Sequence, residues 1–169
     1  SNSKTIIINE APWLVWPVLL RFHEYDNWNP VYRFLSGTAK PGAKVKVEMQ
    51  LDFNKIAEHA TSVMKEKMGT PPPSKKQQVK MIVRQMKEPE ILQLEGKMLS
   101  GLFMHCIHTF ELTPQAERKT KFTCTIQLDG FLPNMMPIHF FDAFYDAMNQ
   151  AFNESLKEYV ETEEERHEI

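Results

Sequence analysis

The sequence predicts an α+β protein in which about seven antiparallel strands form one curved sheet around a long C-terminal helix. In residues 137–160, apolar side chains recur with the 3.6-residue period of a helix for about six turns. Residues 43–53 alternate apolar and polar side chains, which is typical of an antiparallel strand with one buried face. Because several further segments carry strand patterns, we expect a sheet to cover the apolar stripe of the helix.

The first third of the chain is predicted to place one strand and two helical segments before a hairpin. Three isoleucines favour an opening strand, Ala11-Pro12 starts a helix, and Gly37 and Gly42 mark the hairpin. In order, we expect a strand at 4–9, a helix at 11–21, a turn or short helix at 25–30, and strands at 31–38 and 43–53.

The rest of the chain is predicted to hold an inserted helix, four more strands and the long helix. Helical periodicity between Asn54 and Gly69, followed by prolines, makes 54–74 a helical insertion between the third and fourth strands. Residues 161–169 contain five glutamates and are expected to form an acidic frayed tail. The four strands are expected at 75–88, 90–100, 102–113 and 116–132.

Composition and charge describe one domain spanning residues 1–169 and exclude several classes of partner. The formal net charge of −2 includes no basic excess of the kind that binds nucleic acid. No apolar run reaches the ~18 residues that a membrane span needs, so we expect no integral membrane association. Cys106 and Cys124 lack metal-site spacing, which fits a reduced cytoplasmic protein without a metal or cofactor. Ser1-Asn2-Ser3 lacks a Met and resembles the remnant of a tag.

His108 is the strongest candidate for a ligand-binding or catalytic residue, because strand alternation places it on the inward face with Phe110. It could anchor a ligand or act as a general base, and the alternative, which we favour, is a core histidine with a structural hydrogen bond. His105 has the opposite strand parity and is expected on the solvent side, and His23 is expected in a solvated loop. Because His105 and His108 point apart, we expect no metal site.

Cys106 and Cys124 both fall in the inward set, where buried thiols behave as small apolar groups. A nucleophilic cysteine would need a base, and only His108, two residues along the same face, could serve; we disfavour this alternative. The chain has ten methionines, and methionine adapts to irregular gaps, which suits either a deformable pocket or a plain core. The methionines predicted to face inward are Met49, Met81, Met98, Met104 and Met148.

Several short motifs follow one another in a recognisable order. The longest is Gly101-Leu102-Phe103 followed by His108-x-Phe110-x-Leu112. The others are Trp16 in the first helix, Trp28-Asn29-Pro30 after the paired helical segments, Gly37 and Gly42 at the first hairpin, and Gly130 near the end of the last strand. Together they resemble the START-like superfamily, also called SRPBCC or polyketide cyclase/dehydrase-like, which has the helix-grip fold.

The resemblance covers nearly the whole chain and implies a hydrophobic pocket between the sheet and the terminal helix. Members of the superfamily include lipid carriers, hormone and polyketide binders, aromatase/cyclases and activators of a chaperone ATPase, so the fold does not choose a function. The chain departs from the family pattern at Ile126, where many relatives carry an acidic residue, and in the length of segment 54–74.

The leading hypothesis is binding of a small hydrophobic ligand, a lipid, polyketide or aromatic molecule, without demonstrable catalysis. The alternatives are a cyclase- or dehydrase-like enzyme that uses His108 in the same cavity, and a chaperone regulator or other protein-interaction module. A dimer is one option for the oligomeric state, which the sequence does not determine. The cavity wall is predicted to include Trp16, Val47, Met49, Met81, Leu94, Met98, Met104, His108, Phe110, Phe141, Phe144 and Met148.

Overall fold

The computed structural model describes residues 2–51, 75–98, 104–129 and 138–167 of the chain. The strands are β1 (Asn2–Ile8), β2 (Tyr32–Ser36), β3 (Lys44–Leu51), β4 (Lys75–Lys87), β5 (Ile91–Met98), β6 (Met104–Ala116) and β7 (Lys119–Asp129). The helical segments are α1 (Pro12–Leu20), the 3-10 helix η1 (Phe22–Asn27) and α5 (Ile138–His167). The predicted helical insertion at 54–74 lies outside the described residues.

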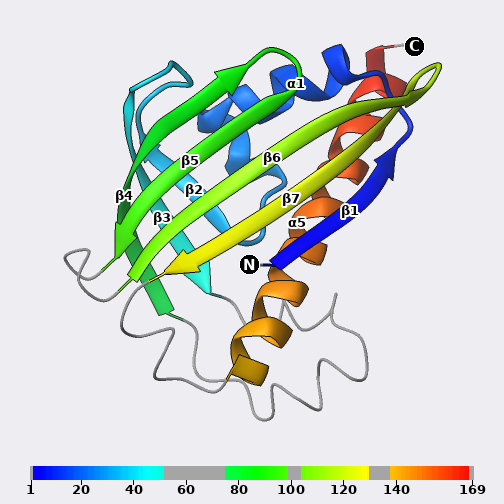
Figure 1. Cartoon of the computed structure of the whole chain (residues 1–169). Helices are drawn as coiled ribbons and strands as arrows, with labels where there is room; N and C mark the ends of the chain where they lie inside the picture. Colours follow the sequence, from blue (N-terminus) through cyan, green and yellow to red (C-terminus); the bar gives the residue numbers. More distant parts are fainter. Residues whose placement is uncertain (1, 52–74, 99–103, 130–137, 168–169) are drawn as a thin grey trace.

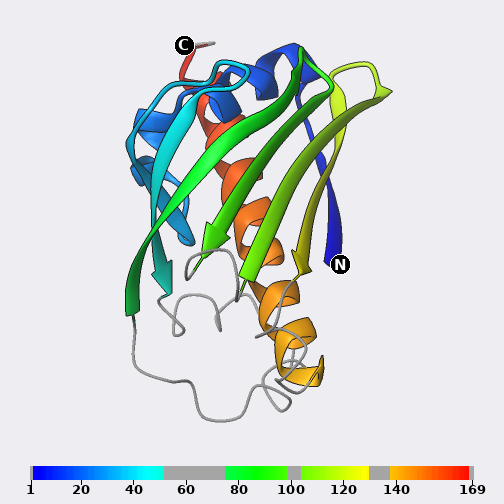
Figure 2. The same cartoon turned by 60° about the vertical axis from the view of Figure 1, so that its left-hand side comes forward.

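The strands form one seven-stranded sheet in the order β1-β7-β6-β5-β4-β3-β2, and neighbouring strands are antiparallel. Figures 1 and 2 show this sheet curving around α5, with α1 at the end where α5 finishes. The predicted fold class, a curved antiparallel sheet around a long C-terminal helix, is therefore confirmed.

Strand alternation and helical periodicity bury one side of each element in a common core. Each strand turns every second side chain toward α5, because successive side chains point to opposite faces of a sheet. The helix contributes an apolar stripe of Met148, Phe152, Leu156 and Val160, each at most 2% exposed. Burying a side chain of this size is worth about 1.5–3 kcal/mol, so this interface holds the helix against the sheet.

A second stripe of α5 is polar and binds the free edge of β1. Asn149, Asn153, Lys157 and Glu161 recur every fourth residue, so they lie along one side of the helix. β1 is an outermost strand, and the backbone groups on its free edge have no strand partner. We call these contacts between the polar stripe of α5 and the edge of β1 the seam. Asn149 Nδ2 donates to the Asn2 carbonyl (3.4 Å), and Asn153 Nδ2 donates to the Lys4 carbonyl (3.1 Å). Lys157 Nζ donates to the Ile7 carbonyl (2.7 Å), and the Asn9 N–H donates to Glu161 Oε1 (2.8 Å).

The seam and a neighbouring ion pair extend into the segment that was expected to fray. α5 continues to His167, well past residue 160. Glu161 accepts from the Asn9 N–H, and Arg21 Nη2 donates to both carboxylate oxygens of Glu163, at 2.9 and 3.1 Å. The last turns of α5 are therefore tied to the residues that follow β1 and α1.

Asn153→Leu keeps the approximate size of the side chain but removes the donor to the Lys4 carbonyl. We expect the free energy of unfolding in urea to fall by about 1–3 kcal/mol, because a partly buried carbonyl loses its partner. Glu158→Ala, at an exposed position of the same helix, should change it by less than about 0.5 kcal/mol. Equally small effects of both substitutions would show that water serves the β1 edge as well as α5 does.

Candidate functional site

His108 lies on the inner face of β6, within a cluster of aromatic rings between the sheet and α5. Its ring centroid is 4.4 Å from that of Phe110, 5.8 Å from Phe152 and 5.9 Å from Tyr32. The residue is 7% exposed, so its ring has little contact with bulk water. Buried polar groups are usually hydrogen-bonded, so the partners of its two ring nitrogens need to be accounted for.

One nitrogen of His108 belongs to a buried relay of three side chains from three elements. Nε2 lies 3.0 Å from Cys124 Sγ on β7, and Cys124 Sγ lies 3.2 Å from Asn149 Oδ1 on α5. His108 pairs with Ile126 in the sheet, which makes Cys124 its diagonal neighbour on the same face. Because Asn149 is also part of the seam, the contact between α5 and β1 supports the relay from outside the core.

The relay has a defined direction, because its outer end can only accept hydrogen bonds. Asp146 Oδ1 accepts from Asn2 Nδ2 at 2.5 Å, and Asn149 Nδ2 donates to the Asn2 side-chain oxygen at 2.9 Å and to its carbonyl at 3.4 Å. Asn149 Oδ1 therefore faces Cys124 and takes the single thiol proton. Since the sulfur has no second proton to give, Nε2 of His108 must be the donor to it. His108 is thus the Nε2–H tautomer, with a lone pair on Nδ1.

Burial keeps the relay uncharged. Removal from water lowers the pKa of His108 from 6.5 to about 3. Burial, with a smaller contribution from Cys106, raises the pKa of the Cys124 thiol well above 9.0. The pair is a neutral imidazole beside a thiol, whereas a cysteine nucleophile needs a thiolate. The thiol proton also goes to Asn149 and not to His108, so this geometry gives a nucleophilic role no support.

Cys106 does not meet Cys124, although both cysteines face inward. The register pairs Cys106 with Leu128 and Cys124 with Phe110, an offset of four residues or about 13 Å along the strands. Burial raises the pKa of Cys106 to about 11, so this residue is also a thiol at neutral pH. In the sequence His108 lies two residues from Cys106 on the same face, whereas the structure brings Cys124 into hydrogen-bond contact with it.

Two neighbouring buried tyrosines differ in one respect. Tyr25 on η1 and Tyr32 on β2 are 0% and 3% exposed, and their ring centroids are 5.9 Å apart. The Tyr25 hydroxyl donates to the Leu19 carbonyl at 2.7 Å. The Tyr32 hydroxyl makes no hydrogen bond to any residue that the structure describes. An unpartnered polar group this deep in a protein is uncommon, which makes Tyr32 a candidate functional residue.

The roles of Tyr32 and Asn149 and the pairing of His108 with Cys124 were not predicted from the sequence. Alternation of Tyr32 with Phe34 on a short strand was a signal for the inward position of Tyr32. The recurrence of Asn149 with polar residues at every fourth position was a signal for the seam. The Cys124 pairing depends on strand register, for which the sequence offered no signal.

Most of the predicted wall residues that the structure describes lie between the sheet and α5. Val47, Met81, Leu94, His108, Phe110 and Met148 are buried, and Met49 is half-buried. Trp16 is buried in α1, at the end where α5 finishes. The side chains that lie outside the described part of the structure are those of Met98 in β5, Met104 in β6, and Phe141 and Phe144 in α5.

The inner face is covered less completely near the start of α5. Met49 on β3, Cys106 on β6 and Tyr145 on α5 are all half-buried. Further along the same two strands, Val45 and Phe110 are 3% and 0% exposed. Among the described side chains of these two strands, burial is therefore more complete at Val45 and Phe110 than at Met49 and Cys106.

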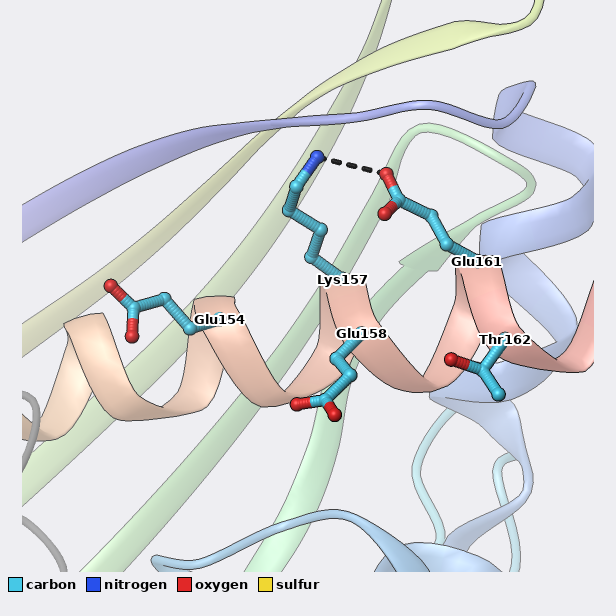
Figure 3. Close-up of a pocket in the computed structure, with 5 residues that line it drawn as sticks. All are labelled: Glu154, Lys157, Glu158, Glu161 and Thr162. Atoms are coloured by element: carbon cyan, nitrogen blue, oxygen red, sulfur yellow. Dashed lines mark hydrogen bonds and ion pairs between the residues drawn. The ribbon is translucent and has the colours of Figure 1, made fainter.

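Two hollows lined by described residues lie on the outer side of α5, and their lining differs from that of the inner face of the sheet. One, of about 290 Å³, is lined by Glu154, Lys157, Glu158, Glu161 and Thr162 (Figure 3). The other, of about 270 Å³, is lined by Asn27, Trp28, Ser155, Glu158, Tyr159 and Thr162. Lys157 in the first already bonds Glu161 at 2.8 Å and the Ile7 carbonyl, so its charge is engaged within the protein. The first hollow is lined mainly by charged side chains, and the second combines two aromatic rings with four polar or charged side chains, so neither resembles an apolar ligand site.

The remaining candidate histidines lie away from the relay. His105 Nε2 is 2.6 Å from Glu95 Oε1, and this hydrogen bond lowers the pKa of the Glu95 carboxyl. His23 is exposed beside Glu24. Within the described ranges, no three His, Cys, Asp or Glu side chains converge as metal ligands, and no helix is long and apolar enough to span a membrane.

Comparisons with known proteins find similarity in structure alone. No protein-family model and no curated protein matches the sequence. A START superfamily protein from Mycobacterium smegmatis matches with a TM-score of 0.67 over 95% of this chain and 96% of that chain, at 14% identity. A conserved protein from Geobacillus kaustophilus matches with a TM-score of 0.64 over 95% and 94%, also at 14% identity. DynU16, from the dynemicin biosynthetic locus, matches with a TM-score of 0.63 over 95% of this chain and 47% of that one, at 17% identity.

This chain has a START-like fold. The helix-grip arrangement that the order of motifs predicted is thereby confirmed. At identities of 14% and 17%, the similarity establishes the fold but no ligand or activity, because one fold hosts many functions. At Ile126, where the sequence departs from the START-like pattern, the side chain is 4% exposed and pairs across the strands with His108. His108 therefore has an apolar neighbour where many START-like proteins carry a carboxyl group.

His108 should make the fold sensitive to mild acid. The unfolded chain protonates this histidine near pH 6.5, whereas the folded chain resists protonation until about pH 3. Neutral His108 therefore contributes its full stabilisation above pH 6.5, and the free energy of unfolding decreases as the pH falls from 6.5 toward 3. At pH 5 the decrease is about 2 kcal/mol. Urea unfolding at pH 7 and pH 5 should show this loss in the wild type but not in His108→Gln, which cannot titrate. Equal losses in both proteins would contradict a buried, neutral His108.

Tyr25→Phe and Tyr32→Phe form a matched pair, since each removes one buried hydroxyl and keeps the ring. Tyr25→Phe should lower the free energy of unfolding by about 1–2 kcal/mol, because the Leu19 carbonyl loses its donor. Tyr32→Phe should leave it unchanged or raise it, because burying an unpartnered hydroxyl is unfavourable. Thermal and urea unfolding of the ligand-free proteins measure both. A loss in Tyr32→Phe as large as that in Tyr25→Phe would mean that the Tyr32 hydroxyl has a structural partner.

Proposed function

We propose that this protein binds a small hydrophobic molecule, a lipid, polyketide or aromatic compound, between the inner face of the sheet and α5. The observation that carries the proposal is the incomplete covering of the inner face near the start of α5, where Met49, Cys106 and Tyr145 are half-buried. The interiors of folded proteins are otherwise packed as densely as organic crystals. A bound apolar molecule would remove this remaining surface from water, which is favourable at about 25 cal/mol per Å².

The charge of the inner face supports an uncharged ligand. Among the inward-facing side chains on β2 to β7 whose burial the structure describes, none is Lys, Arg, Asp or Glu. His108 is neutral, with a pKa of about 3. Burying a charge without a partner is strongly unfavourable, so a neutral molecule fits this surface better than a fatty-acid anion.

The composition of the inner face supports a ligand of irregular shape. Met49, Met81 and Met148 come from β3, β4 and α5, and all three contribute flexible, polarizable side chains to the space between them. Such side chains change rotamer at little cost, whereas branched ones hold a fixed shape. The START-like fold supports the same location, because it places the C-terminal helix against the inner face of the sheet.

A substitution that fills the loosely packed region tests the proposal. Cys106→Phe should weaken binding of the neutral fluorescent probe N-phenyl-1-naphthylamine by at least about tenfold, because the new ring occupies the ligand's space. The free energy of unfolding should stay within about 0.5 kcal/mol of the wild type or rise, since the region has room for the ring. Displacement of the probe by long-chain alcohols, sterols and polycyclic aromatics, with mass spectrometry of gently purified protein, identifies the preferred class.

Thr113→Phe is the matched control, because it adds the same ring at an exposed position of the same strand. It should leave probe binding unchanged. The proposal is contradicted if neither the probe nor any member of the panel binds the wild type. It is also contradicted if Cys106→Phe leaves binding intact and destabilises the fold by about 1–3 kcal/mol, as overpacking of an already filled core would.

A further inference from the structure

Two polar groups with unused hydrogen-bonding capacity lie close together on the inner face. The Tyr32 hydroxyl has no partner among the described residues, and the residue is 3% exposed. The ring centroids of Tyr32 and His108 are 5.9 Å apart, with their planes at 63°. Tyr32 also lies within electrostatic range of both Cys106 and Cys124, the cysteines on either side of His108. The hydroxyl from β2 and the imidazole from β6 therefore approach the same part of the interior.

His108 presents an acceptor there, and the relay is the reason. Its Nε2–H is engaged with Cys124 Sγ, which leaves the lone pair of Nδ1. No residue that the structure describes hydrogen-bonds to Nδ1, and Tyr32 does not reach it despite the closeness of the rings. One unused acceptor and one unused hydroxyl thus remain beside apolar side chains.

The chemistry of these two groups defines what satisfies both. Nδ1 can only accept a hydrogen bond, and the Tyr32 hydroxyl is free to donate one. The complementary ligand group must therefore donate to His108 and accept from Tyr32. A hydroxyl group does both, whereas an ether or ketone oxygen accepts from Tyr32 but has no proton for Nδ1.

We propose that the bound molecule carries an uncharged hydroxyl group, as an alcohol or a phenol, which donates to His108 Nδ1 and accepts from the Tyr32 hydroxyl. This inference rests on the proposed function and narrows its ligand class. Tyr32 and His108 form the polar end of the site, and the methionine and phenylalanine side chains of the inner face surround the rest of the ligand.

Charged ligand groups fit the same two partners poorly. A carboxylate would place negative charge against the lone pair of Nδ1, and the inward side chains of β2 to β7 whose burial the structure describes include no Lys or Arg to pair with it. An ammonium group could donate to Nδ1 but could not accept from Tyr32, and it would be buried without a carboxylate. A neutral hydroxyl avoids both penalties.

Matched ligands that differ only in their polar group test this inference on the full chain. 2-Naphthol, 2-methoxynaphthalene and 2-naphthoate share one ring system, and 1-dodecanol, its methyl ether and dodecanoate share one alkyl chain. Displacement of N-phenyl-1-naphthylamine at pH 7 and fixed ionic strength gives the affinity of each. In the wild type, at least one set should bind, and its hydroxyl member should bind about tenfold tighter than the ether, with the carboxylate weakest.

Tyr32→Phe should reduce the advantage of the hydroxyl over the ether to less than about threefold, and the affinity for the ether should not change. Tyr25→Phe is the matched control, because the hydroxyl that it removes is already bonded to the Leu19 carbonyl. That variant should retain the full advantage of the hydroxyl ligand. Both substitutions keep the aromatic ring and its packing.

The outcomes separate the two proposals. Hydroxyl and ether members that bind the wild type equally, or a hydroxyl advantage that survives Tyr32→Phe, would overturn hydroxyl recognition and leave the apolar site in place. A carboxylate that binds tightest would overturn it in the same way. If the probe and both sets fail to bind, the proposed function fails, and hydroxyl recognition fails with it.

Discussion

The free edge of β1 is the constraint on which the rest of the structure depends. An edge strand exposes carbonyl and N–H groups that must find partners. α5 supplies them from Asn149 to Glu161 at every fourth residue, while its apolar stripe of residues 148–160 faces the concave sheet. One helix thus binds the edge of β1 and packs against the inner face of the sheet. These two contacts together fix the rotation of the helix as well as its position.

The rotation of α5 decides the chemistry of the interior. The amide nitrogen of Asn149 donates hydrogen bonds to Asn2 of β1, so its amide oxygen faces Cys124. The thiol proton points to that oxygen, so the sulfur accepts from His108. A helix contact at the edge of the sheet is in this way linked, through hydrogen bonds of defined direction, to the tautomer of a buried histidine. Without the seam, Asn149 could present either end of its amide, and His108 could adopt either tautomer.

Local patterns in the sequence predicted much of this structure, and non-local pairings account for the rest. Alternation and helical periodicity are properties of neighbouring residues, so they predicted the seven strands, α5 and the inward side of His108. Strand register is not local, and it places Cys124 and not Cys106 beside His108. The four polar seam residues resemble a solvated helix face because they bond to backbone groups of β1 and Asn9, and every residue has such groups. That the Tyr32 hydroxyl has no partner among the described residues is likewise a property of the packed interior and of no sequence pattern.

The most direct test of the claim that the seam sets the state of His108 is long-range ¹H–¹⁵N NMR of its imidazole ring. We predict a protonated Nε2 and a bare Nδ1 at pH 7, with nitrogen shifts that stay constant as the pH is lowered to about 4, because the pKa is about 3. An Nδ1–H tautomer at pH 7, or an imidazolium that forms near pH 6.5, would contradict it.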